Sequence, residues 1–156
     1  MYKQRKNMET DNYDLQRFVN AQENSYTIAL SELKNGYKKS HWMWYIFPQI
    51  IGLGFSETAQ FYAIKDLNEA TLYFQHEILG KRLIEVSDVL LNLNNRSAMD
   101  IFGYPDDLKL CSSMTLFTQI ENTSPVFKNV LDKYFNRKYD QKTLQILNKK
   151  SVNIIV

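Results

Sequence analysis

Hydrophobic residues recur along most of the chain at steps of three and four, the spacing that lines one face of an α-helix. The clearest stripe consists of Leu79, Leu83, Val86, Leu90 and Leu93. The same spacing predicts helices over residues 13–33 with a break near 24–25, 41–47, 57–63, 66–74, 79–93, 106–119, 125–135 and from about 140 onward, with a short turn over 97–102.

Residues that typically begin and end helices stand at these boundaries. Ser40, Ser56 and Asp66 each precede a predicted helix and can accept a hydrogen bond from its first N–H groups. Gly36 and Gly103 follow predicted elements, where a left-handed terminal residue is common. Only 5 Gly and 3 Pro occur, too few turn residues for an all-β sandwich or barrel. The pattern therefore predicts an all-α fold, a compact single-domain bundle of about seven to eight short and medium helices.

Length and composition assign this bundle to one domain. The 156 residues fit the usual ~100–200 residues per domain. The hydrophobic share of 44% and the charged share of 23% are those of an ordinary folded protein. Because the first residues are polar and aperiodic, we expect a flexible arm over 1–11, a single all-α domain over 12–149 and a C-terminal tail over 150–156.

The number of cysteines and the hydropathy of the chain indicate the cellular compartment in which the protein is expected. The single Cys111 cannot form an intramolecular disulfide, and with two histidines it supplies too few ligands for an ordinary zinc site. No apolar run approaches the ~18 residues of a membrane span, and the basic N-terminus lacks the apolar stretch of a secretory signal. We therefore expect a cytoplasmic protein with no membrane segment, no metal and no cofactor.

The net charge of +2 is unevenly distributed. Residues 125–156 carry seven Lys and Arg against two acids, which raises the possibility of weak nucleic-acid binding through a basic C-terminus. Asp132 and Asp140 interrupt this run and no recognised binding motif accompanies it, which favours an ordinary solvated helix face.

An aromatic segment over residues 40–49 departs from the amphipathic pattern, because nearly every position is large and apolar. His41 shares a helical face with Trp44 and Tyr45, and Gln49 lies just beyond Pro48. An imidazole, an indole, a phenol and an amide could converge there on a ligand. The alternative is a core helix whose polar atoms bond to the backbone.

The predicted helix over 106–119 departs in a similar way. Asp106, Lys109 and Ser113 fall on one stripe, and Ser112 with Thr115 on another. A cation surrounded by hydroxyl groups suits a phosphate or a carboxylate. The alternative is an exposed Asp–Lys pair with hydroxyl groups that bond back to the preceding turn.

These two segments contain the most specific motifs by which the chain resembles a known protein family. The chain resembles the uncharacterised family called domain of unknown function 1810 over about residues 14–147, and the motif residues fall on His41, Trp42, Trp44, Pro48, Gln49, Gly52, Gly54, Ser56, His76, Asp106, Lys109, Ser112, Ser113 and Thr115. The resemblance implies a compact all-α single domain and supplies no activity. This chain departs from the family at Glu77, where Pro is usual, and at Cys111, where Arg is usual. The loss of that Arg removes a strong anion ligand.

Together these observations predict a domain that binds a small polar ligand, nucleotide-like or phosphorylated, in a polar and aromatic pocket. Trp44, Gln49, Asp106, Lys109 and Thr115 are the predicted ligand-binding residues. The sequence is compatible with binding alone and with hydrolysis or transfer, for which the candidate catalytic residues are His41, Ser112 and Ser113. The main alternative is a protein-interaction or structural module in which the aromatic segment is a partner surface or core.

Overall fold

Helices account for the regular structure of this computed structural model, which describes residues 13–155, with side chains to Lys150. The flexible arm expected over 1–11 lies outside the described residues. In chain order the helices are α2 (Gln16–Gln22), α3 (Tyr26–Lys34), α4 (Met43–Ile46), α5 (Glu57–Tyr62), α6 (Leu67–Gln75), α7 (Leu79–Asn92), α8 (Ala98–Phe102), α9 (Asp106–Thr118), α10 (Val126–Tyr134) and α11 (Gln141–Ile155).

This order confirms the all-α fold class, with ten helices in the described residues rather than seven or eight. The difference arises because the break near residues 24–25 separates α2 from α3 and because the turn after Ser97 closes into α8. Helix α11 continues to Ile155, through residues expected to form a tail. The extended pairing found among residues 13–155 is an isolated parallel bridge between Ile50 and Ile64.

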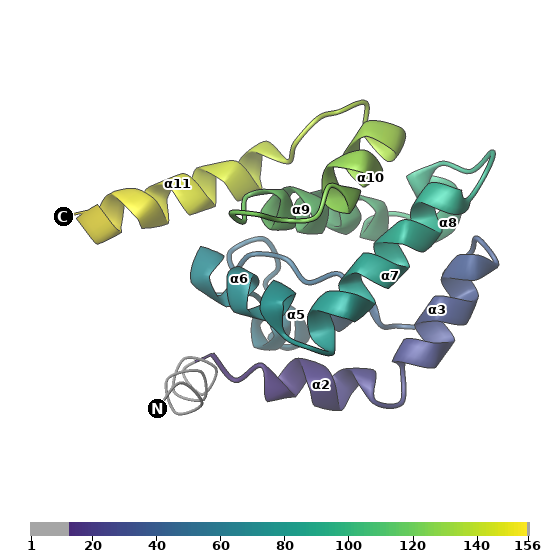
Figure 1. Cartoon of the computed structure of the whole chain (residues 1–156), viewed down its shortest axis with the longest axis horizontal. Coiled ribbons are helices and arrows are strands. Elements are labelled where there is room, and N and C mark those ends of the chain that lie inside the picture. The colour runs from purple at the N-terminus through teal and green to yellow at the C-terminus, as the bar shows by residue number, and fades with distance from the viewer. Residues whose placement is uncertain (1–12, 156) are drawn as a thin grey trace.

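The core is built around α7 and α9. Helix α10 packs on both, α3 and α6 pack on α7, and α8 and α11 pack on α9. Figure 1 shows α2 below this group and α11 extending beyond it at one end. Aromatic rings join the layers: the Phe117 ring lies 5.5 Å from Tyr73 of α6 and 5.6 Å from Phe127 of α10.

Several helix starts follow the predicted capping chemistry. The Asp66 carboxylate accepts a hydrogen bond from the Glu69 N–H at 2.8 Å, and the Ser56 hydroxyl accepts one from Ala59. Ser97 and Asp100 form a reciprocal capping box at the start of α8. Helix α10 begins at Val126, one residue later than expected, with its first N–H bonded to the Ser124 hydroxyl. None of the helices within residues 13–155 has the length and apolar character needed to cross a membrane.

Candidate functional site

The segment that joins α3 to α4 is held in place by Glu32 of α3. Its Oε1 accepts hydrogen bonds from the Lys39 N–H at 2.7 Å, the Ser40 N–H at 2.9 Å and the Trp42 indole N–H at 2.9 Å. Its Oε2 accepts one from the Ser40 hydroxyl at 2.6 Å. Gly36, with φ +76°, lets the chain turn back after α3 toward this carboxylate. One side chain therefore fixes the start of the aromatic segment.

These contacts also set the ionisation of Glu32. Partial burial favours the neutral acid, but the hydrogen bonds from Ser40, Lys39 and Trp42 favour the carboxylate and lower the pKa to about 2. Glu32 is therefore negatively charged throughout the physiological range.

Two lysines share one carboxylate beside two tryptophans. Lys38 Nζ lies 3.0 Å from Asp106 Oδ2, and Lys109 Nζ lies 3.2 Å from Asp106 Oδ1. Lys38 Nζ is also 5.2 Å from the Trp42 ring centroid, and Lys109 Nζ is 5.7 Å from that of Trp44. We call Lys38, Trp42, Trp44, Asp106 and Lys109 the lysine–tryptophan cluster. It joins the segment after α3 to α4 and to the first turn of α9.

The cluster is partly removed from water. The side chain of Lys38 is 9% exposed, that of Asp106 19% and that of Lys109 28%. Each ammonium group carries three N–H donors, and Asp106 is the hydrogen-bonding or ionic partner of both in the described part of the chain. Donors therefore remain on both lysines, and the more buried Lys38 has the greater need of a further oxygen acceptor.

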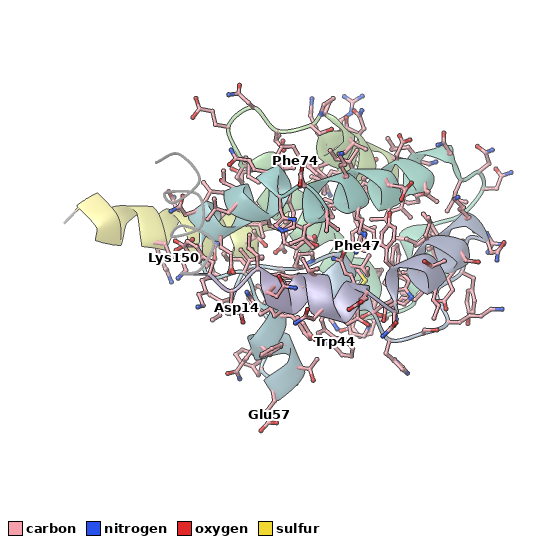
Figure 2. All side chains as sticks on the ribbon, turned by 60° about the horizontal axis from the view of Figure 1, so that its bottom comes forward. Asp14, Trp44, Phe47, Glu57, Phe74 and Lys150 are labelled. Atoms are coloured by element: carbon pink, nitrogen blue, oxygen red, sulfur yellow. The ribbon has the colours of Figure 1, made fainter. Side chains whose placement is uncertain are left out.

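The predicted pair of Asp106 and Lys109 is thus present, with Trp44 beside it and half-buried. His41 is exposed and Gln49 is half-buried, and neither side chain forms a hydrogen bond to another described residue. Trp44 is labelled in Figure 2, on the side of the molecule where α2 and α5 also lie. The sequence did not identify Lys38, because its partner Asp106 is distant in the chain.

Ser112 and Thr115 lie elsewhere, at the contact between α9 and α11. The Ser112 hydroxyl donates to Asp140 Oδ2 at 3.1 Å, and Thr115 Oγ1 accepts from the Asp140 N–H at 2.8 Å. The same Asp140 oxygen accepts a hydrogen bond from the Thr143 N–H at 3.1 Å, so that Asp140 caps the start of α11. The hydroxyls of Ser112 and Thr115 therefore fix the N-terminus of α11 against α9. The Ser113 hydroxyl is fully buried and has no hydrogen-bond partner among the described residues.

Cys111, which stands where the family usually has Arg, is half-buried in the same contact. Its thiol donates to the Lys138 carbonyl at 3.7 Å. Burial, with a smaller contribution from the Asp140 charge, raises the pKa of the thiol to about 11. The thiolate needed for nucleophilic attack is therefore scarce at neutral pH. No group of three or more His, Cys, Asp or Glu side chains among the described residues is arranged to hold a metal ion.

Much of the aromatic segment belongs to the core. Trp42 is 1% exposed, and Phe47 is fully buried against Phe102 with ring centroids 5.9 Å apart. The Trp42 ring therefore forms no exposed partner surface, and its burial fits the form of the alternative in which the aromatic segment is core. Exposed aromatic area lies instead on and before α5, at Phe55 and Phe61, which are 82% and 56% exposed.

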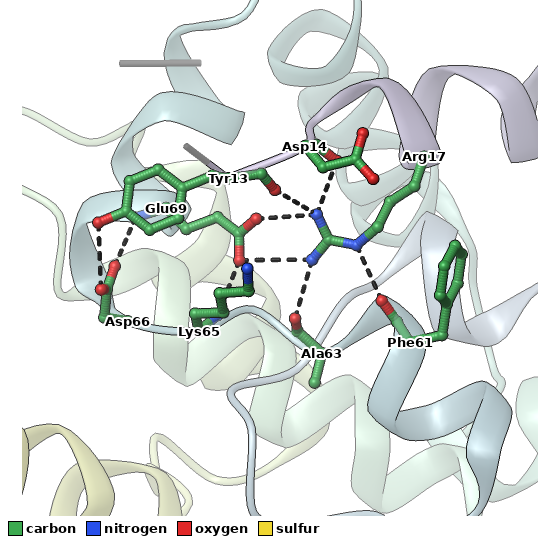
Figure 3. A network of polar contacts seen from close by, with 8 residues as sticks. All are labelled: Tyr13, Asp14, Arg17, Phe61, Ala63, Lys65, Asp66 and Glu69. Atoms are coloured by element: carbon green, nitrogen blue, oxygen red, sulfur yellow. Dashed lines mark hydrogen bonds and ion pairs between the residues drawn. The ribbon is translucent and has the colours of Figure 1, made fainter. Parts of the chain in front are cut away.

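A second polar cluster, missed in the sequence, surrounds Arg17 of α2 (Figure 3). Its guanidinium pairs with Glu69 of α6 at 2.9 Å and donates to the Phe61 carbonyl at 2.8 Å and the Ala63 carbonyl at 2.9 Å. It also donates to the Tyr13 and Asp14 carbonyls. Because the guanidinium nitrogens all have partners within the protein, this cluster is better suited to holding α2 in place than to binding a ligand.

Comparison with known proteins identifies the family. The search of curated proteins finds no match. Among solved structures, a conserved hypothetical protein from Mycobacterium tuberculosis is similar with a TM-score of 0.86 and 45% identity, over 88% of this chain and 98% of that one. The model of a family described as protein of unknown function DUF1810 matches residues 12–147. With nearly the whole helical domain matched, this chain belongs to the DUF1810 family.

Proposed function

We propose that the lysine–tryptophan cluster binds a small ligand that carries an anionic group and a planar ring, as nucleotide-like and phosphorylated metabolites do. The observation that carries the proposal is the sharing of Asp106 by two ammonium groups, at 3.0 and 3.2 Å, one of them on a side chain that is only 9% exposed. Phosphate or carboxylate oxygens are strong acceptors for ammonium donors of this kind.

The aromatic half of the proposal rests on Trp44. This ring is half-buried, and Lys109 lies over it at 5.7 Å, so cation and ring are available side by side. A planar group stacked on the exposed part of Trp44 would bring an attached anion close to Lys109. Such a pairing of one aromatic anchor with a few placed polar groups is typical of small-molecule sites.

The contacts favour binding over chemistry. Ser112 is bonded to Asp140 and Ser113 is fully buried, so these two candidate catalytic hydroxyls are poorly placed to reach a ligand. His41 is exposed and remains the candidate base if a ligand at the cluster is hydrolysed or transferred. Gln49 and Thr115, the latter bonded to Asp140, are not assigned to the cluster.

A thermal-shift screen tests the proposal. Purified protein is heated with inorganic phosphate, ribose 5-phosphate or ADP, alongside Lys109→Met and, as a matched control, Lys81→Met at an exposed position of α7. A ligand at ~100 times its dissociation constant adds about 2.7 kcal/mol to the free energy of unfolding. We expect ADP to raise the wild-type midpoint most, Lys81→Met to respond like wild type, and Lys109→Met to lose most of the shift. Equal responses of the two variants, or no response of the wild type to any probe, would refute the proposal.

A Trp44→Leu variant separates the two halves of the site. If the ring stacks on the planar group, the variant loses the advantage of ADP over inorganic phosphate while its response to phosphate is kept. An unchanged preference for ADP would show that Trp44 is not the stacking surface. Unfolding of each ligand-free variant supplies its own baseline, since loss of a half-buried ring also lowers stability.

A further inference from the structure

A concave surface lies on α3 and the extended segment that follows it, apart from the lysine–tryptophan cluster. Residues of this surface line an open hollow of about 350 Å³, at the small end of the ~300–1,000 Å³ of ligand pockets. None of the residues of the lysine–tryptophan cluster lines it. Side chains along residues 37–39 alternate between the two places: Tyr37 and Lys39 line the hollow, whereas Lys38 between them reaches Asp106.

The hollow presents apolar surface to solvent. Ile28 is 50% exposed and Tyr37 is 53% exposed, although both are large residues that proteins commonly bury. An exposed phenol ring at the edge of a concavity offers a flat face for stacking and a hydroxyl for hydrogen bonding. These two residues would supply the apolar contact of a bound ligand.

Around this apolar surface the polar groups both donate and accept. Ser31 and Asn35 of the α3 end each offer a donor and an acceptor, and Lys39 offers an ammonium group. Glu32 contributes a carboxylate whose Oε1 already accepts three hydrogen bonds. Its Oε2 accepts one, from Ser40, and keeps capacity for another donor.

The charges of the hollow favour a neutral ligand. Glu32 stays ionised because its pKa is lowered to about 2, and its negative charge offsets that of Lys39. An anion would meet repulsion from Glu32, whereas the lysine–tryptophan cluster has two cations for one shared carboxylate. The two surfaces therefore differ in the ligands they suit.

We propose that this hollow binds a neutral saccharide, with a sugar ring stacked on Tyr37 and its hydroxyl groups bonded to Glu32 Oε2, Asn35 and Lys39. A sugar hydroxyl donates and accepts at once, which matches the mixed polar groups, and the C–H face of the ring matches the phenol. The proposal is independent of the function proposed for the lysine–tryptophan cluster.

Amide chemical shifts of isotopically labelled full-length protein test this assignment, with maltotriose and tri-N-acetylchitotriose as the probes. At millimolar concentration we expect at least one trisaccharide to cause saturable shifts confined to residues 27–39 and their neighbours. Tyr37→Ala should weaken the apparent affinity about tenfold or more, equivalent to about 1.4 kcal/mol. Tyr104→Ala, which removes an aromatic ring that is 73% exposed elsewhere, should leave the affinity unchanged.

Three results would overturn the assignment: no saturable shift with either trisaccharide, shifts that survive Tyr37→Ala, or shifts that lie outside the hollow. Lys109→Met distinguishes the two proposals, because it should abolish the response to ADP and leave the trisaccharide titration intact. In the wild-type protein, a response to ADP without one to either trisaccharide would overturn the saccharide proposal alone, and the reverse result would overturn the proposal for the lysine–tryptophan cluster alone.

Discussion

Glu32 is the residue whose ionisation is most strongly tied to the structure around the candidate site. Four donors from the segment after α3 surround its carboxylate, and they lower its pKa from the ordinary 4.5 to about 2. A depressed pKa in the folded state means that ionised Glu32 stabilises the fold above pH 4.5, and that this stabilisation is lost as the pH falls from 4.5 toward 2.

We therefore expect Glu32→Gln to lower the free energy of unfolding at pH 7 by about 1–2 kcal/mol, a value reduced for the partial exposure of the carboxylate. The difference from wild type should shrink by more than half at pH 3. Urea unfolding at the two pH values measures it, with Glu121→Gln at an exposed loop position as the control. A penalty as large at pH 3 as at pH 7 would contradict an electrostatic origin.

The residues that sequence reasoning found and missed differ in the separation of their partners. Asp106 and Lys109 are three apart on one helix, so their contact is readable from spacing. Lys38 and Glu32 escaped notice because their importance depends on a turn at Gly36 and on a distant helix. Spacing placed Ser112 and Thr115 on one stripe of an apolar helix, but it could not show that their hydroxyls bond to Asp140 at the start of α11.

At the scale of helices, the buried ion pair of Arg17 and Glu69 fixes α2 against α6 and the end of α5. Their side chains are 6% and 0% exposed, and removal of one partner from such a pair costs about 3–5 kcal/mol. We expect Arg17→Met to lose about this much stability in urea unfolding, because the Glu69 charge stays buried. Adding Glu69→Gln to that variant should cost far less than Glu69→Gln does alone. Strict additivity of the two substitutions would mean that the pair contributes no coupling.

Lys133 of α10 shows how a basic residue near the C-terminus is used within the fold. Its ammonium group donates to the Leu90 carbonyl at 3.1 Å, the Leu91 carbonyl at 2.8 Å and the Leu93 carbonyl. These carbonyls lie in the last turn of α7 and at its C-cap, where no following turn of helix supplies N–H donors. The Leu90 carbonyl also accepts from the Leu93 N–H at 3.4 Å and from the Tyr134 hydroxyl at 2.5 Å.

We expect Lys133→Met to lower the free energy of unfolding by about 1–2 kcal/mol. Lys128→Met, an exposed change on the same helix, should stay within about 0.5 kcal/mol of wild type. Chemical denaturation of the two variants measures both values. If they proved equally stable, the contacts of Lys133 would carry no weight, and its charge would be free for a role such as nucleic-acid binding.

The positions of the helices were largely predictable, whereas their packing was not. Hydrophobic spacing and capping residues act within one or two turns, which is why Asp66 and Ser97 mark true helix starts. The predicted number of helices was too low because a short break, such as that before α3, interrupts the helical hydrogen bonds without interrupting the apolar stripe. Which helices touch depends on long-range contacts, and spacing carries no information about them.

For the molecule as a whole, α11 raises the question of where the folded unit ends. Thr143 is fully buried and Leu147 is 9% exposed on this helix, which starts at the Asp140 cap and runs beyond the main body in Figure 1. The family match ends at residue 147, close to the last of these buried side chains. The buried side chains described on α11 therefore lie at or before residue 147.

A chain that ends at Lys150 should consequently unfold within about 0.5 kcal/mol of the full-length protein, because the buried side chains described on α11 all precede Lys150. A chain that ends at Tyr139 should lose about 3 kcal/mol or more. It lacks the burial of Leu147 and leaves the hydroxyls of Ser112 and Thr115 without Asp140. Urea unfolding of both truncations measures the contrast, and far-UV circular dichroism verifies that the remaining helices form. If the shorter truncation were as stable as the longer one, α11 would be an appendage rather than part of the core. If the chain ending at Lys150 lost as much as the other, the folded unit would extend past the family boundary.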